Sequence, residues 1–459
     1  MGIEYLGLSS INGPLVILEG VQDAFLMRSS NLRLMENEKI GRIIELYEDK
    51  AVIQVLRERK YVLDNTRTKL TGHPMEVSLA PDMLGRTFNG IGKPIDGLGP
   101  LITDVKRDVN GLPLNPVRRK YPRNYIRTGI SAIDGLTTLI RGQKLPIFSG
   151  NGLPHDQLAA QIVKQASLGD GSDEPFAVVF GAMGVKHDVA DFFQKTFEES
   201  GVADHVCMFL NLANDPVVER LITPKVALTA AEYLAFDCNM HILVILTDMT
   251  SFAEAMREVS SSKGEIPSRK GYPGYLYSEL ATLYERAGII KGAEGSVTQL
   301  PILTMPNDDI THPIPDLTGY ITEGQIVLDR NLNGQSIYPP ISVLPSLSRL
   351  MKDGIGEGYT REDHQDLANQ LFSAYAKVGE ARNLASVIGE DELSPIDKKY
   401  LEFGKAFEER YIGQGPEENR SMIETLDLGW ELLKILPREE LDRIDTKIID
   451  KYLPKEQES

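Results

Sequence analysis

The sequence is poor in cysteine, in long apolar runs and in net positive charge, and each shortage excludes a class of protein. Its 459 residues include only two cysteines, Cys207 and Cys238. Both lie in apolar stretches without metal-ligand spacing, so we interpret them as buried, reduced thiols with no function. A disulfide framework and a cysteine-based metal site are therefore excluded.

Apolar runs are short throughout the chain. The stretch Ile242 to Leu246 is typical, whereas a membrane-spanning helix needs roughly 20 apolar residues. The amino terminus carries no basic and apolar signal segment. We therefore expect a protein on the cytoplasmic side, without direct membrane insertion.

The formal net charge of −17 argues against a nucleic-acid partner. Binding a polyanion relies on clustered lysines and arginines that release counterions. One basic segment exists, Val117 to Arg123, and we interpret it as a solvated or interface turn.

Residue patterning divides the chain into three predicted domains. Closely spaced short strands without helices predict a small β-barrel over residues 1–75, with strands at Gly13 to Glu19, Ile40 to Leu46 and Ala51 to Leu56. The turn-rich segment Gly85 to Pro100 is interpreted as a loop after this boundary.

Residues 76–350 are predicted to form an α/β domain with a parallel sheet, because apolar strands alternate with amphipathic helices. Strands are expected at Phe176 to Phe180, His205 to Leu210, His241 to Leu246, Ser296 to Thr304 and Gly324 to Leu328, with helices at Val189 to Glu199 and Val217 to Phe236. Residues 351–459 are predicted to be helical, with helices at Arg361 to Ile388, Pro395 to Tyr411 and Arg420 to Leu436.

The segment Phe148 to Ala160 has the placement of a phosphate-binding loop, after an apolar strand and before a predicted helix, Gln157 to Leu168. A working loop reads G-x-x-x-x-G-K-[ST], in which backbone N–H groups cradle phosphates, the lysine reaches their oxygens and the hydroxyl ligates Mg²⁺. Residues 149–156 keep this spacing, and Ser149 and Asn151 stand within the loop.

The chemistry of the loop is altered at its last three positions. Pro154 replaces the second glycine and removes an N–H donor, and His155 replaces the charged lysine with a shorter imidazole. Asp156 replaces the hydroxyl, and a carboxylate at a helix start satisfies the N–H groups itself and repels a phosphate. We expect no nucleotide and no metal ion to be bound by this loop.

A second element of the lost site is Asp248, which follows the strand His241 to Leu246 in the manner of a Mg²⁺-binding Walker B aspartate. An active enzyme also needs a carboxylate at the end of the neighbouring strand to orient the attacking water. That position reads Phe180 to Gly184, around Ala182, and holds no acid. Asp188, a little further on, is assigned to the first turn of the next helix.

The segment Tyr338 to Leu350 resembles the P-x-x-x-x-x-x-S-x-S signature of the alpha/beta chains of rotary ATPases, with Arg349 directly after the final serine. Ser342 stands where that family usually has asparagine. Together with the loop at Gln143 to His155, the chain resembles the non-catalytic B subunits ("beta chains") of V/A-type rotary ATPases. Further matching segments are Met83 to Arg86, Gly92 to Gly97, Thr128 to Gly135 and Gly271 to Tyr277.

This resemblance implies a RecA-like central domain and a regulatory, non-catalytic role in a ring that couples ATP hydrolysis or synthesis to H⁺ or Na⁺ transport. It implies that Arg349 reaches, as an arginine finger, into the site of the neighbouring catalytic A subunit, where ATP or ADP and Mg²⁺ bind at the interface. The implied partners are the A subunits of an alternating A3B3 ring, the central rotor stalk and a peripheral stalk at the N-terminal domain. The segment Asp391 to Ser394 resembles the acidic rotor-facing turn of the family, and a solvated acidic turn is the alternative.

Two other functions remain open at this stage. A self-sufficient RecA-like ring ATPase with an unusual P-loop would hydrolyse ATP alone and depend on Asp248. A nucleic-acid motor such as a Rho-like helicase is disfavoured by the acidic charge and the altered loop.

Overall fold

The structure is a computed structural model that describes residues 4–12, 15–21, 28–34, 37–47, 49–55, 66–111, 114–169 and 171–453. The chain forms two compact units, each assembled from two segments. Unit 1 comprises residues 1–115 and 177–286, and unit 2 comprises residues 116–176 and 287–459. Three predicted strand residues, Gly13, Pro14 and Leu56, lie outside the described ranges.

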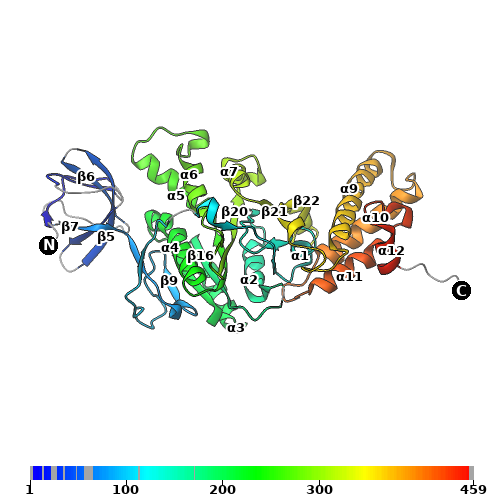
Figure 1. Ribbon diagram of the computed structural model, residues 1–459. Coiled ribbons are helices and arrows are strands. Elements are labelled where there is room, and N and C mark those ends of the chain that lie inside the picture. The colour runs from blue at the N-terminus through cyan, green and yellow to red at the C-terminus, as the bar shows by residue number, and fades with distance from the viewer. Residues whose placement is uncertain are drawn as a thin grey trace. The chain divides into compact units, whose positions relative to one another are not determined.

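Unit 1 begins with a seven-stranded antiparallel sheet that curls around its own core (Figure 1). Its strand order is β1-β7-β4-β5-β6-β3-β2. Alternating apolar residues such as Val16, Ile43 and Ile53 are buried inside it, as the period-2 pattern predicts. The strands of this barrel are β1 (Glu4–Leu6), β2 (Ser10–Asn12), β3 (Leu15–Leu18), β4 (Arg28–Leu34), β5 (Asn37–Tyr47), β6 (Lys50–Val55) and β7 (Thr66–Pro74).

The rest of unit 1 is an α/β layer with the strand order β18-β16-β17-β9. Helices cover these strands, and Phe193 of α3 packs on Phe180 of β16 with ring centroids 4.5 Å apart. The elements are β8 (Glu76–Ser78), β9 (Thr87–Asn89), β10 (Lys106–Asp108), β16 (Phe176–Val185), α3 (His187–Glu199), β17 (Val206–Leu212), α4 (Val217–Phe236), β18 (His241–Thr247), α5 (Met249–Ser262) and α6 (Leu276–Tyr284).

Unit 2 contributes strands in the order β22-β21-β14-β20 to the ten-stranded sheet. The central strand β14 is parallel to both of its neighbours, while β22 returns antiparallel to β21. The elements are β11 (Arg119–Lys120), β12 (Tyr125–Arg127), α1 (Ser131–Asp134), β13 (Leu139–Ile140), β14 (Ile147–Gly150), α2 (His155–Gln165), β15 (Ser167–Leu168), β19 (Gly288–Ile290), β20 (Ser296–Met305), α7 (Pro313–Ile321), β21 (Gly324–Leu328), α8 (Arg330–Gly334) and β22 (Ile341–Ser348).

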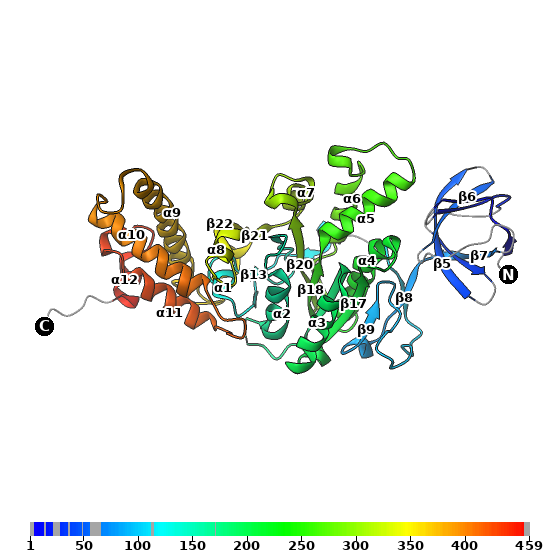
Figure 2. The same ribbon diagram turned by 180° about the vertical axis from the view of Figure 1, so that it is seen from behind.

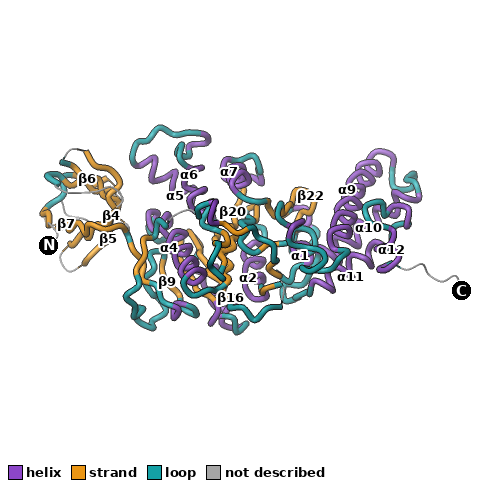
Figure 3. The backbone as a smooth tube through the Cα atoms, in the orientation of Figure 1, coloured by secondary structure: helices purple, strands orange, loops and turns teal. Residues whose placement is uncertain are grey.

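The C-terminal part of unit 2 is helical, as Figure 3 shows in purple. Phe403, Phe407 and Tyr411 form a buried aromatic stack in its core. The helices are α9 (His364–Ile388), α10 (Pro395–Ala406), a π-helical turn (Phe407–Ile412), α11 (Met422–Leu433) and α12 (Thr446–Tyr452). A capping box between Ser421 and Glu424 begins α11, which satisfies two N–H groups at the helix start.

The expected architecture is confirmed: N-terminal strands, an α/β nucleotide-binding-type domain and C-terminal helices. The three-domain boundaries stay a prediction. Among the described residues, no helix has both the length and the apolar character needed to cross a bilayer.

Three local predictions were wrong. The supposed loop Gly85 to Pro100 contains strand β9, which pairs in parallel with β17 and stacks Phe88 on Phe209 at 5.2 Å. Three residues are too few to show a strand period, so tertiary contacts decide this strand. The helix after the altered loop runs from His155 to Gln165, and the last predicted positions form β15. Cys207 is buried as expected, but Cys238 is only partly buried.

Candidate functional site

The altered loop lies between a buried strand and a helix, as its placement predicts. All four residues of β14 are buried between β20 and β21, and the helix α2 begins at His155. Pro154 is the residue before the helix, and its side chain makes no capping hydrogen bond. Asp156 therefore lies in the first turn of α2, where its negative charge meets the positive end of the helix dipole.

The imidazole of His155 turns back into the loop instead of pointing outward. Its Nδ1 lies 3.0 Å from the hydroxyl oxygen of Ser149, and its Nε2 lies 3.7 Å from a carboxylate oxygen of Asp156. A P-loop lysine would extend toward phosphate oxygens from this position. Here the ring is held by the loop's own residues.

Arg330 and Asp308, which come later in the chain, contact the same loop. Arg330 donates from Nη2 to the carbonyl oxygen of Asn151 at 2.9 Å, and it binds Asp308 through two hydrogen bonds of 2.6 and 2.9 Å. The guanidinium of Arg330 lowers the pKa of Asp308, which keeps this carboxylate ionised.

The ionised carboxylate of Asp308 lies against the loop backbone. A Cβ atom placed on Gly150 would come within 2.1 Å of Asp308 Oδ1. Its negative charge is therefore next to the backbone that cradles a phosphate in a working loop. The residues present do not fit a triphosphate, since the lysine and one N–H donor are missing and two carboxylates face the site.

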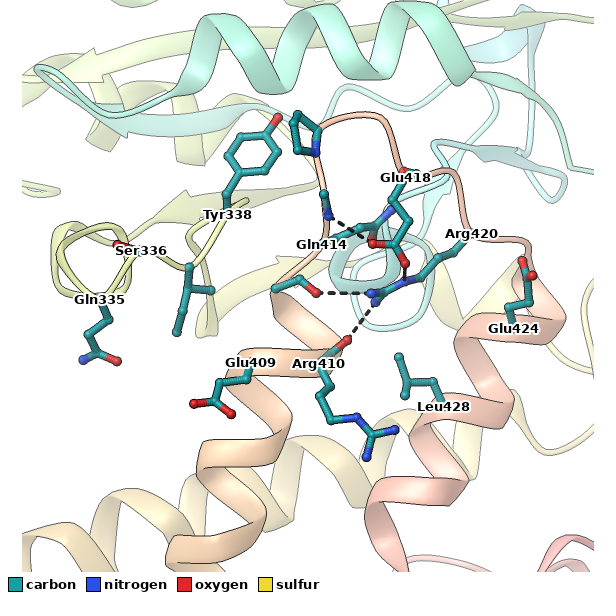
Figure 4. A pocket seen from close by; sticks show the side chains of 14 residues that line it. Gln335, Ser336, Tyr338, Glu409, Arg410, Gln414, Glu418, Arg420, Glu424 and Leu428 are labelled. Carbon is teal, nitrogen blue, oxygen red and sulfur yellow. Dashed lines mark hydrogen bonds and ion pairs between the residues drawn. The ribbon is translucent and has the colours of Figure 1, made fainter.

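An open cavity of about 840 Å³ lies beside the loop that precedes α11 (Figure 4). Its two arginines are already engaged. Arg420 donates to Glu418 at 2.6 Å and to the carbonyl oxygens of Arg410 and Gly413, as the dashed lines in Figure 4 show. Arg410 itself pairs with Glu431 at 2.7 Å. The cavity is linked to α2 through Gln161, which bonds to Tyr338, Gly415 and Glu418.

Asp248 belongs to unit 1 and is the N-cap residue of α5. Its carboxylate accepts a hydrogen bond of 2.8 Å from the backbone N–H of Thr250. The neighbouring strand β16 runs through the buried Ala182, and Asp188 lies in the first turn of α3, as predicted. In the described ranges, no group of three or more histidine, cysteine or carboxylate side chains is arranged to hold a metal ion.

Arg349 follows β22 directly, and its backbone is firmly held. Its N–H donates to the carbonyl oxygen of Glu323 at 2.9 Å, next to the pair Gly324 and Ser348 that begins the β21–β22 register. The carboxylate of Glu323 is in turn bound by Lys144, through an Nζ contact of 2.8 Å and a backbone N–H bond of 3.0 Å.

The two serines of the signature hold β22 from its buried side. Ser346 donates to the carbonyl oxygen of Ser342 at 2.5 Å, and Ser348 donates to that of Thr138 at 2.9 Å. Gln143 donates to the Ser348 hydroxyl at 3.0 Å. The carbonyl of Ser342 takes part in this network, so the serine in place of asparagine is compatible with a closed turn.

The side chain of Arg349, unlike its hydrogen-bonded backbone, makes no polar contact with the described residues. It is exposed, and its guanidinium forms no hydrogen bond or ion pair with any residue in the part of the chain that the structure describes. A rigid backbone that presents an exposed, unpaired guanidinium is the arrangement of a group available to an external anion.

The fold and the site define an α/β nucleotide-binding-type protein whose own phosphate loop is filled by its own side chains. Residues 129–348 match the model of the ATP synthase alpha/beta family, nucleotide-binding domain, and residues 353–453 match that of the C-terminal domain of V and A type ATP synthase. The chain is 62% identical over 452 residues to "V-type ATP synthase beta chain 2" of Clostridium tetani, covering 98% of each.

Other relatives agree. Identity is 62% over 451 residues to the V-type ATP synthase beta chain of Halothermothrix orenii, covering 98% of this chain and 97% of the relative. Among solved structures, the ATP synthase subunit NeqB of Nanoarcheaum equitans is similar with a TM-score of 0.74 and 39% identity, over 92% of this chain and 98% of that one. The chain belongs to the family of V-type ATP synthase beta chains.

Sequence reasoning missed Arg330 and Asp308 as partners of the loop. They are separated from each other by 22 positions and from Asn151 by more than 150. No local motif marks them, since only the meeting of β14, β20 and β21 brings their chain ends together.

Proposed function

We propose that this chain is the non-catalytic, regulatory subunit in the hexameric head of a V/A-type rotary ATPase. In that head it alternates with catalytic A subunits, and the complex couples ATP hydrolysis or synthesis to H⁺ or Na⁺ transport. One contrast carries the proposal: the chain's own loop is contacted by His155 and Arg330, whereas Arg349 is exposed and has no partner among the described residues. The names of its relatives, V-type ATP synthase beta chains, support its place in such a complex.

Arg349 acts in trans as an arginine finger on the nucleotide of the neighbouring A subunit. The planar, permanently charged guanidinium neutralises negative charge that develops on the transferring phosphoryl group. ATP or ADP and Mg²⁺ belong to that interface, where they supply the reacting phosphate and the charge that balances it. The positions Ser149, Asn151, Pro154, His155, Asp156 and Asp248 mark this chain's own lost site.

We propose domain boundaries at 75/76 and 350/351, and a different partner in the complex for each terminal domain. We assign the N-terminal domain to the peripheral stalk and the C-terminal helices to the rotor. The segment Asp391 to Ser394 joins α9 to α10, and the exposed Val387 and Ile388 precede it. An acidic turn beside exposed apolar side chains suits a partner surface. The complex places this chain at the cytoplasmic face of the membrane.

The test is ATP hydrolysis by the A3B3 head reconstituted with Arg349→Ala. We expect the ring to assemble and hydrolysis to fall by a factor of roughly 10³ or more, as for other arginine fingers. Normal turnover by the assembled variant ring would refute the finger. ATP hydrolysis by the purified chain alone, abolished by Asp248→Ala, would instead favour a self-sufficient ATPase.

A further inference from the structure

Unit 1 holds a cavity of about 290 Å³. Its lining residues fall within 42–54 and 221–279 and include none of the altered loop. Strands β5 and β6 of the barrel form one wall, and α4, α5 and α6 form the other. Figures 1 and 2 show the helices α4, α5 and α6 from opposite sides. The charged and amide side chains that line it are Arg42, Glu45, Gln54, Lys225, Lys263, Glu265 and Glu279.

Two buried hydrogen-bond donors in this cavity have no partner in the part of the chain that the structure describes. Arg42 donates from Nη2 to Gln54 Oε1 at 3.4 Å, which fixes the orientation of the Gln54 amide. The Nε of Arg42 and the Nε2 of Gln54 remain buried and without an acceptor among the described residues. Gln54 is only 1% exposed. Leaving such buried donors unsatisfied is unfavourable, so the wall suits an acceptor that it does not itself contain.

The charge of the cavity wall points to the same kind of occupant. Lys225 and Glu279 form an ion pair of 3.2 Å, and Glu279 also interacts electrostatically with Arg42. One carboxylate thus serves two cations. Burial lowers the pKa of both Arg42 and Lys225, and repulsion by Arg42 lowers the pKa of Lys225 further. An additional negative charge would relieve this repulsion.

The other charged side chains of the cavity are already committed to partners. Glu265 accepts hydrogen bonds from Ser260 and Tyr275 and lies 3.6 Å from Lys263. Glu45 accepts from Tyr47 at the surface. Arg42 and Lys225 therefore share Glu279 as the carboxylate that interacts with both of them. Tyr275 is 41% exposed and the side chain of Glu279 is 32% exposed, so the cavity opens to solvent on that side.

We propose that this cavity binds a small oxyanion, of the size of inorganic phosphate or sulfate, through Arg42, Gln54 and Lys225. The unprotonated oxygens of an oxyanion accept hydrogen bonds, so one ion satisfies both of these donors beside the cations Arg42 and Lys225. The cavity volume suits one tetrahedral ion with a few water molecules. Because the binding groups come from the barrel and from α4, a bound ion joins these two parts of unit 1.

The test is isothermal titration calorimetry of the full-length chain with inorganic phosphate, in a phosphate-free buffer with matched KCl. We expect phosphate and sulfate to bind and to raise the thermal unfolding midpoint, because a ligand that binds only the folded state stabilises it. Titration with ADP separates a free oxyanion from the phosphate groups of a nucleotide. We expect the response to phosphate to persist when a large excess of ADP is present.

Two variants assign the binding to this cavity. Arg42→Met and Gln54→Leu each remove a donor, and we expect each to weaken phosphate binding by roughly tenfold or more. Lys195→Met is the matched control, since it removes one positive charge from an exposed i,i+4 pair on α3. If Arg42→Met does not fold, Gln54→Leu alone decides. If phosphate gives no response beyond that to KCl, water alone fills the cavity and the proposal is wrong. If wild type and Gln54→Leu respond equally, phosphate binds outside this cavity and the proposal is wrong as well.

Discussion

The imidazole Nδ1 of His155 lies 3.0 Å from the hydroxyl oxygen of Ser149, so the residue in the lysine position of the loop is bonded to the residue at its start. This contact closes the loop on itself. Pro154 lacks an N–H, and Arg330 is bound to the Asn151 carbonyl oxygen, so several polar groups of the loop are used internally or missing. This internal bonding is the reason for our proposal that the chain contributes to catalysis through Arg349 rather than through its own loop.

Restoring the loop chemistry should restore binding but not hydrolysis. In the triple variant Pro154→Gly, His155→Lys and Asp156→Thr, the N–H donor, the lysine and the Mg²⁺-binding hydroxyl return together. We expect affinity for a fluorescent ATP analogue to rise at least roughly tenfold over the wild type, corresponding to about 1.4 kcal/mol. The isolated variant should remain inactive, because no acid near Ala182 orients the attacking water. Hydrolysis by this variant would contradict that reasoning.

Lysine should not replace arginine at position 349. An ammonium is a point charge and cannot make the two-pronged contact of a guanidinium with a phosphoryl group. We expect Arg349→Lys to retain less than about a tenth of wild-type hydrolysis in the reconstituted ring, as an order-of-magnitude estimate. The control is Lys352→Ala, which removes an exposed charge three residues further on and should leave turnover unchanged.

His364 should make the C-terminal helices sensitive to mild acid. The ring is fully buried, with Nε2–H donating to the Gly135 carbonyl oxygen and Nδ1 facing the Thr360 hydroxyl, each at 3.0 Å. Burial lowers its pKa to about 4 from 6.5. Below pH 6.5 the unfolded chain takes up a proton that the folded chain refuses, so stability is complete above pH 6.5 and declines toward pH 4. The loss amounts to roughly 3 kcal/mol.

The single tryptophan, Trp430, reports this unfolding, since its indole N–H bonds to Asp363 beside the histidine. Urea unfolding followed by its fluorescence should show a weaker decline between pH 6.5 and 4 in His364→Gln, which has no titrating ring. His205→Gln, at an exposed histidine, should keep the wild-type decline. Identical pH dependence in wild type and His364→Gln would rule out this origin.

Gly324→Ala should disturb the backbone that presents Arg349. Gly324 has φ of +135°, and an added Cβ would lie 2.0 Å from the Leu347 carbonyl oxygen. We expect a loss of stability of about 2 kcal/mol or more, with reduced hydrolysis in the assembled ring. Gly319→Ala in α7 meets no atom within 4 Å and should stabilise slightly, by at most about 1 kcal/mol. Equal thermal midpoints for the two variants would contradict the steric argument.

Much of the fold could be predicted because long elements have a clear period. The helix Val217–Phe236 and the strand Gly324–Leu328 were predicted to the residue, and β18 to within one residue. The sequence pattern failed to predict elements that are short, and it failed to predict ends of elements that tertiary contacts determine. Strand β9 has three residues and exists because Phe88 packs on Phe209 and β17 supplies its hydrogen bonds. The predicted helix Pro395 to Tyr411 is split at Ala406 by a π-helical turn.

The sequence by itself determined the chemistry that the loop lacks, because proline has no N–H and histidine cannot replace lysine wherever the chain places them. It also marked Arg349 through the serines that precede it. Only the tertiary structure decided what fills the loop and which arginine is free. The serine signature does not show which arginine is paired: Arg330 binds Asp308, 22 residues away, while Arg349 has no partner within the described chain. The reason is physical: ion pairing depends on distances of a few ångströms in space, which separation along the chain does not encode.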